Sequence, residues 1–91
     1  MVTELKFSQN AYGKWETVFT ASGDRMGIEV NRDSSGPLLV LAGINGLKAK
    51  QIQDFGPNAD SIIIFEIDVP AEIEITIISF TEVIAAKVTG V

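Results

Sequence analysis

The chain has 91 residues and contains neither cysteine nor histidine, which excludes disulfide bridges, thiolate chemistry and the commonest general base and metal ligand. Its apolar fraction of 46% is high for so short a chain, because a small fold has little interior in which to hide apolar surface. The net charge of −5 repels phosphate backbones and argues against nucleic-acid binding. We therefore expect a subunit that covers part of its surface with neighbours; the alternative is a well-packed monomer.

Beta-branched residues dominate the composition, with twelve Ile, eight Val and six Thr, and such side chains pack well on a pleated sheet. Turn-forming residues interrupt the chain at short intervals. The sequence predicts about eight short strands, at 3–8, 14–20, 25–31, 37–44, 48–53, 61–67, 72–79 and 82–89. This spacing, with no helical pattern, is typical of an all-β fold. We expect an antiparallel β-sandwich, jelly-roll or immunoglobulin-like, that occupies residues 1–91 as one domain.

Alternation of apolar and polar residues indicates which side chains face the interior. The strand at 25–31 alternates strictly, whereas 37–44 is apolar on both faces, as expected for a central strand or one covered by a neighbour. Asn45-Gly46 suits a tight hairpin turn after it. The expected core residues are Leu5, Phe7, Val18, Ile28, Val30, Val40, Phe65, Ile67, Ile73, Ile75 and Ile77.

An acidic cluster lies within the densest apolar stretch, 61–80, and comprises Glu66, Asp68, Glu72 and Glu74. If the strands on either side of Pro70 were hairpin partners, these like charges would face one another, at a cost of up to ~1 kcal/mol per pair. Either the chain turns a corner at 69–71 from one sheet to the other, or the strands pair and meet a basic partner, or the carboxylates share a cation. The corner is favoured, because proline supplies no donor to a strand ladder.

A group of apolar side chains, Ile62, Ile64, Ile78 and Phe80, lies on the face opposite to the expected core at one end of this stretch. An outward apolar residue alone needs no explanation, but four together form a patch. We interpret the patch as a subunit contact. The alternative is a second layer of core beneath the loop at 54–60.

No membrane or export signal is recognisable in the sequence. The opening residues, MVTELKFSQN, lack a charged leader followed by an apolar run, so we expect cytosolic synthesis without a signal peptide. The stretch 61–80 is interrupted by four carboxylates and Pro70, which excludes a membrane-spanning helix there.

Catalytic and metal-binding motifs are also missing, so we expect no enzyme and no cofactor. Asp54, Asn58 and Asp60 share one loop and are weak candidates for calcium ligands, because hard cations prefer oxygen donors. The dense spacing of a calcium loop is absent, and the same residue types form local hydrogen bonds in turns. We expect the turn role.

Sugar recognition would use exposed aromatic rings, and only Tyr12 and Trp15 lie close together in the sequence. Trp15 shares a strand face with Thr17 and Phe19, which favours a place in the core. Tyr12 lies in a turn and is the better candidate for exposure. A glycan-binding module, with or without calcium, is therefore the second functional hypothesis.

Two segments, KWETVFTASGDRMGIEV and VPAEIEITIISFTEVIAAKV, resemble the small β-sandwich accessory proteins of tailed-phage virions, such as decoration, head-fibre and tail-associated modules. The resemblance covers the whole chain but rests on strand and turn pattern, and that group has no defining catalytic or ligand motif to carry over. It implies a non-enzymatic structural subunit, a homo-oligomer or a component docked on a larger particle such as a virion.

Overall fold

The computed structural model describes residues 2–44 and 49–90, so the Asn45-Gly46 turn lies outside the described residues. The described strands are β1 (Val2–Glu4), β2 (Ser8–Gln9), β3 (Trp15–Thr20), β4 (Met26–Arg32), β5 (Leu38–Gly43), β6 (Lys50–Asp54), β7 (Ile62–Ile67), β8 (Glu74–Ser79) and β9 (Val83–Thr89). Nothing in the described ranges forms a helix that could cross a membrane.

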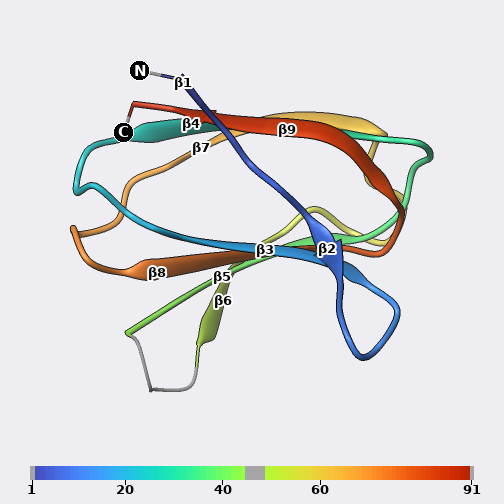
Figure 1. Ribbon diagram of the computed structural model, residues 1–91, viewed down its shortest axis with the longest axis horizontal. Helices are drawn as coiled ribbons and strands as arrows, with labels where there is room; N and C mark the ends of the chain where they lie inside the picture. Colours follow the sequence, from blue (N-terminus) through green and yellow to red (C-terminus); the bar gives the residue numbers. More distant parts are fainter. Residues whose placement is uncertain (1, 45–48, 91) are drawn as a thin grey trace.

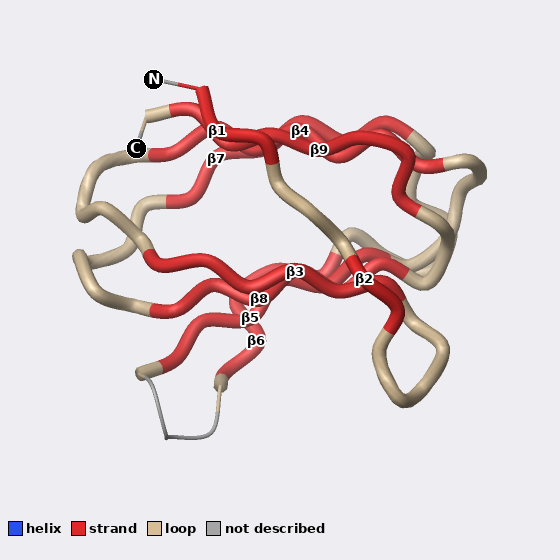
Figure 2. Tube along the Cα trace, in the orientation of Figure 1, coloured by secondary structure: helices blue, strands red, loops and turns tan. Residues whose placement is uncertain are grey.

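Two antiparallel sheets face each other (Figure 1, Figure 2). Sheet A has the strand order β1-β9-β4-β7, and sheet B has the order β2-β3-β8-β5-β6. The predicted antiparallel β-sandwich is thereby confirmed.

A long hairpin wrapped round itself explains this strand order. Outward from the β5–β6 pair, β4 pairs with β7, β3 with β8, and the first arm of the hairpin, which is divided into β1 and β2, pairs with β9 through β1. The folded ribbon then curls so that β9 meets β4 and β8 meets β5. This wrapping is that of a jelly roll, which decides between the two arrangements that the sequence left open.

The first predicted strand, 3–8, is wrong as a single element. It consists of β1, which pairs with β9 in sheet A, and β2, which pairs with β3 in sheet B. Between them the chain crosses from one sheet to the other, and the Leu5 N–H still donates to the Ala86 carbonyl oxygen at 2.9 Å. Because the crossing passes along the open side of the sandwich, Leu5 and Phe7 pack against the core without belonging to one flat strand.

The core lies between the sheets and follows the predicted alternation closely. Of the predicted core residues, the structure buries Leu5, Ile28, Val30, Val40, Ile67, Ile75 and Ile77, and it packs Phe7, Phe65 and Ile73 half-buried against them. Val18 is the error, since it is 49% exposed. Its strand neighbours Thr17 and Phe19 face the interior, so the alternation of β3 turns Val18 outward.

The corner at 69–71 is confirmed, because β7 belongs to sheet A and β8 to sheet B. Two backbone hydrogen bonds hold the corner against Ala21: the Glu72 N–H donates to the Ala21 oxygen, and the Ala21 N–H donates to the Ile73 oxygen. Glu72 has φ = 73°, a left-handed conformation that is uncommon for a residue other than glycine. The change of sheet removes the repulsion that hairpin pairing would have caused.

Candidate interaction surfaces

A buried arginine lies at one end of the sandwich and was not foreseen from the sequence. Met26, Ile28 and Val30 face the interior of β4, and the same alternation places Arg32 inward, where it is 2% exposed. The signal was present in the sequence, but the predicted strand stopped at Asn31, one residue too early.

The Arg32 guanidinium is surrounded by hydrogen-bond acceptors from two loops and from the end of β8. Nη1 donates to the carbonyl oxygens of Gly36 (2.9 Å) and Pro37 (3.1 Å) and to the Ser79 hydroxyl (3.4 Å). Nη2 donates to the carbonyl oxygens of Ala59 (3.1 Å) and Asp60. The side chain therefore joins the loops that follow β4 and β6 to the end of β8.

No carboxylate compensates this charge within residues 2–44 and 49–90, where the only ion pair joins Lys6 and Glu4 on the surface. Burial lowers the pKa of Arg32 from its ordinary value, because the charged form loses its hydration. Arginine is nevertheless so basic that the group stays protonated at neutral pH. The Arg32 guanidinium donates to five acceptors and is buried. It therefore stabilises the surrounding segments and is not available to a ligand.

Two of the weak calcium candidates, Asp54 and Asp60, accept hydrogen bonds from other groups of the protein. The Asp54 carboxylate accepts a hydrogen bond of 2.8 Å from the Gly56 N–H, which is the local turn role expected for it. The Asp60 carbonyl oxygen is taken by Arg32. The described residues contain no group of three or more acidic side chains that could hold a metal ion.

The acidic cluster is divided between the two sheets. Glu66 lies on β7 in sheet A, opposite Gly27, whereas Glu74 lies on β8 in sheet B, between Thr20 and Gly43. Because the strands are not neighbours, the hairpin pairing on which the basic-partner and shared-cation interpretations were based does not occur.

The predicted apolar patch is likewise not one surface. Ile62 and Ile64 point outward from sheet A and are 57% and 72% exposed, while Ile78 and Phe80 belong to the outer face of sheet B. The four side chains would form one surface only if β7 paired with β8, and the corner at 69–71 prevents that pairing. The exposure of Ile62 and Ile64 also excludes the second core layer beneath the 54–60 loop; instead Phe55 packs there on Phe65, with 4.9 Å between ring centroids.

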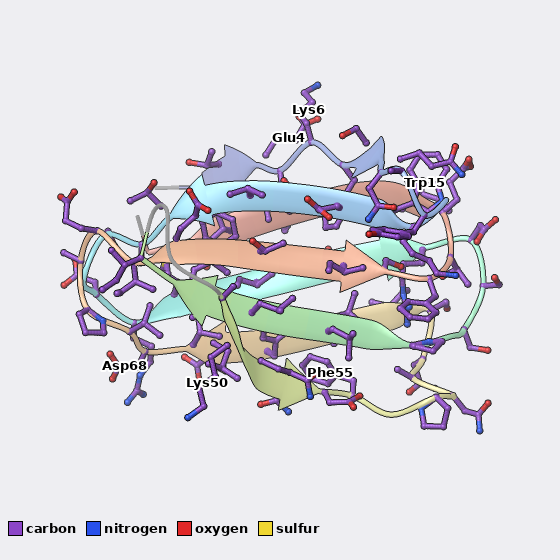
Figure 3. The ribbon with its side chains drawn as sticks, turned by 90° about the horizontal axis from the view of Figure 1, so that it is seen from below. Glu4, Lys6, Trp15, Lys50, Phe55 and Asp68 are labelled. Atoms are coloured by element: carbon purple, nitrogen blue, oxygen red, sulfur yellow. The ribbon has the colours of Figure 1, made fainter. Side chains whose placement is uncertain are left out.

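The outer face of sheet B carries apolar side chains on each of its central strands β3, β8 and β5. Three rows run across it from β3 through β8 to β5: first Glu16, Ile78 and Leu39, then Val18, Thr76 and Leu41, and last the row without large apolar residues, Thr20, Glu74 and Gly43. Figure 3 looks onto this face, with Lys50 and Phe55 toward its β6 side. The two-sided apolar character predicted for 37–44 thus arises because Leu39 and Leu41 point outward while Leu38 and Val40 fill the core.

Phe80 extends this face beyond the end of β8. Its ring is 40% exposed and lies 4.4 Å from the ammonium nitrogen of Lys14, a cation–π contact worth ~0.5–1 kcal/mol at an exposed site. Together Val18, Leu39, Leu41, Ile78 and Phe80 are called the sheet B apolar face.

The outer face of sheet A is more polar at its centre. One row runs Glu4, Lys87, Glu29 and Ile64 across all four strands, so opposite charges alternate before the apolar edge at β7. A shallow hollow of about 410 Å³ lies over β1, β9 and β4. Its lining includes Lys87 between the acidic side chains Glu4 and Glu29, so the hollow carries one more negative than positive group.

The two aromatic candidates for a sugar site are placed differently. Tyr12 is 85% exposed at the tip of the β2–β3 loop, and Trp15 begins β3 half-buried (Figure 3). The loop is well braced, since the Asn10 carboxamide oxygen accepts hydrogen bonds from the N–H groups of Tyr12 (2.9 Å) and Lys14 (3.0 Å). Among the described residues, the only aromatic ring pair in contact is Phe55 with Phe65, so Tyr12 and Trp15 do not stack on each other.

Comparison with known proteins adds no relative: no family model matches the chain, and neither a curated protein nor a solved structure matches it.

Proposed function

We propose that the protein is a non-enzymatic structural subunit, which assembles with copies of itself or docks on a larger particle such as a phage virion. The observation that carries the proposal is the sheet B apolar face. A sandwich buries only the inner faces of its sheets, and the outer face of a solvated sheet is normally polar. Here the outward positions of β5 and β8 include Leu39, Leu41 and Ile78.

A neighbouring molecule on this face would explain the excess of apolar residues. Contiguous apolar surface on a small protein marks an interaction site, and its removal from water contributes roughly 25 cal/mol per Å². The high apolar fraction of 46% in so short a chain points the same way. The resemblance of the strand and turn pattern to virion accessory proteins supports the same class of role.

Substitution of Val18 by Asp tests the proposal, because Val18 is exposed and its side chain lies outside the core. We expect a folded protein whose native mass falls, since a charge in an apolar contact is costly. Ser35→Asp is the matched control: it adds the same charge in an exposed loop away from both faces and should leave native mass unchanged. A wild-type chain that is monomeric, or a Val18→Asp variant with the mass of the wild-type oligomer, rejects self-assembly through this face.

A glycan-binding module that uses Tyr12 and Trp15 is the alternative, favoured by the rigid presentation of Tyr12 on its braced loop. Titration with glycans should then quench the fluorescence of Trp15, the only tryptophan in the chain. The Tyr12→Ala variant should lose this response while keeping the same melting temperature. An unchanged spectrum together with a large native mass favours the structural subunit.

A further inference from the structure

The free edge of β7 carries backbone groups without partners in sheet A. The Arg32 N–H donates to the Ser61 oxygen at 2.8 Å, which marks the Arg32–Ser61 pair as hydrogen-bonded. Because such pairs alternate along an antiparallel ladder, the peptide groups of Ile63, Phe65 and Ile67 point to β4. Those of Ile62, Ile64 and Glu66 therefore point outward, away from the sheet.

The other sheet edges are protected in the ways that proteins commonly use. β1 has three residues, and its Glu4 is paired with Lys6 at 3.3 Å. β2 has only two residues. β6 carries Lys50 and Asp54, and its pairing with β5 is interrupted by a register shift.

β7 has none of these protections. It pairs with β4 over six residues in unbroken register, contains no proline or lysine, and has a single charged side chain, Glu66. A hollow of about 390 Å³ is lined by residues 62–64 of the strand and by the loop at 55–60. A long, regular and apolar edge is a template for another strand.

We propose that β7 pairs antiparallel with β7 of a second copy of this chain, which joins two copies of sheet A into one continuous sheet about a two-fold axis. The inference rests on the proposed function, a self-assembling subunit, and specifies one of its contacts. Closed two-fold symmetry is the commonest arrangement of homo-oligomers.

The sequence of β7 is compatible with this arrangement, because no like charges lie opposite one another. With the axis at Ile64, the outward peptide groups of Ile64 meet those of its copy, and Ile62 lies opposite Glu66 of the partner subunit. Each such pair exchanges two N–H···O bonds, and the two Glu66 carboxylates stay apart. On the inner face Ile63 lies opposite Phe65 of the partner subunit, so the apolar strip of each core continues across the junction.

Amide hydrogen exchange resolved by residue tests the pairing directly. In dilute protein the amides of Ile62, Ile64 and Glu66 should exchange rapidly, whereas those of Ile63, Phe65 and Ile67 should be protected by β4. In concentrated protein the first three should slow by about tenfold or more as the native mass rises. The exchange rates of the outward amides thus measure pairing at the edge of β7, and the inward amides of the same strand serve as internal controls.

Ile64→Pro should abolish both the added protection and the dimer. Its own N–H makes no bond to β4, and proline is tolerated at such edge positions. Ile64→Thr is the matched control, which keeps the N–H and should still pair. An oligomer in which the three amides remain unprotected overturns the pairing and leaves the proposed function standing. A chain that stays monomeric at every concentration overturns both self-pairing and self-assembly, and leaves the edge to a strand of another protein.

Discussion

Nη2 of Arg32 donates a hydrogen bond of 3.1 Å to the carbonyl oxygen of Ala59, and this contact joins the end of β4 to the loop before β7. The two residues are 27 positions apart in the chain. Several loop carbonyls at this end of the sandwich accept hydrogen bonds from the buried Arg32 side chain. The stability of this end therefore depends on a single residue.

We expect Arg32→Met to reduce the free energy of unfolding by about 3–5 kcal/mol, because the acceptors of two loops and of Ser79 lose their donor. Urea denaturation measures the loss. Arg25→Met is the control, since Arg25 is exposed, and it should change stability by less than ~0.5 kcal/mol. Equal stabilities of the two variants would contradict the role assigned to Arg32.

Replacement of the same residue by lysine should recover little of the lost stability. The two terminal nitrogens of the guanidinium donate to different loops, Nη1 to the Gly36 oxygen and Nη2 to the Ala59 oxygen. A lysine ammonium is a point charge that cannot reproduce this fork. We expect Arg32→Lys to remain at least ~2 kcal/mol less stable than the wild type, as measured by urea denaturation. A lysine variant of wild-type stability would show that charge alone suffices.

Glu72→Asn should stabilise the protein. Glu72 holds φ = 73° at the corner before β8, and asparagine adopts the left-handed region more readily than glutamate does. We expect a gain of about 1 kcal/mol, which would raise the melting temperature by ~4–8 °C in a domain of this size. Glu72→Gln removes the charge but keeps the strain, so its melting temperature should rise less.

Ile62→Asp and Phe80→Asp should act on different contacts. The two side chains lie on opposite outer faces of the sandwich, and both are exposed, so each variant should remain folded. Native mass spectrometry of the single and double variants should show independent effects: Phe80→Asp weakens contacts of the sheet B apolar face, and Ile62→Asp weakens those at β7. Unfolding of either variant, seen by circular dichroism, would place that residue in the monomer core.

Asp54→Ala should lower stability by about 1 kcal/mol, because the Gly56 N–H loses its acceptor. Thermal melts with and without calcium separate this turn role from an ion site. If the turn role is correct, calcium leaves the melting temperature of both proteins unchanged. A rise with calcium in the wild type that Asp54→Ala abolishes would restore the metal hypothesis.

Local pattern was sufficient to predict most of the strands and the direction in which their side chains point. The alternation in 61–67 and 72–79 correctly placed Ile67, Ile75 and Ile77 inside, because successive side chains of a strand face opposite sides. Pro70 marked the corner, because it cannot take part in a strand ladder. The error at Val18 arose on a strand with apolar residues on both faces, where alternation alone does not identify the inner one.

Only the tertiary structure decided which strands became neighbours. Ile62 and Ile78 have the same outward direction in their own strands, yet wrapping of the hairpin places them on opposite sides of the molecule. The same wrapping brings Ser79 and the loop at 59–60 to Arg32 and leaves β7 at an edge. By itself the sequence determined the class of fold and the parity of the strands that have one polar face, because both depend on residues close together in the chain. The partners of each strand depend on how distant segments pack, and no local pattern records that choice.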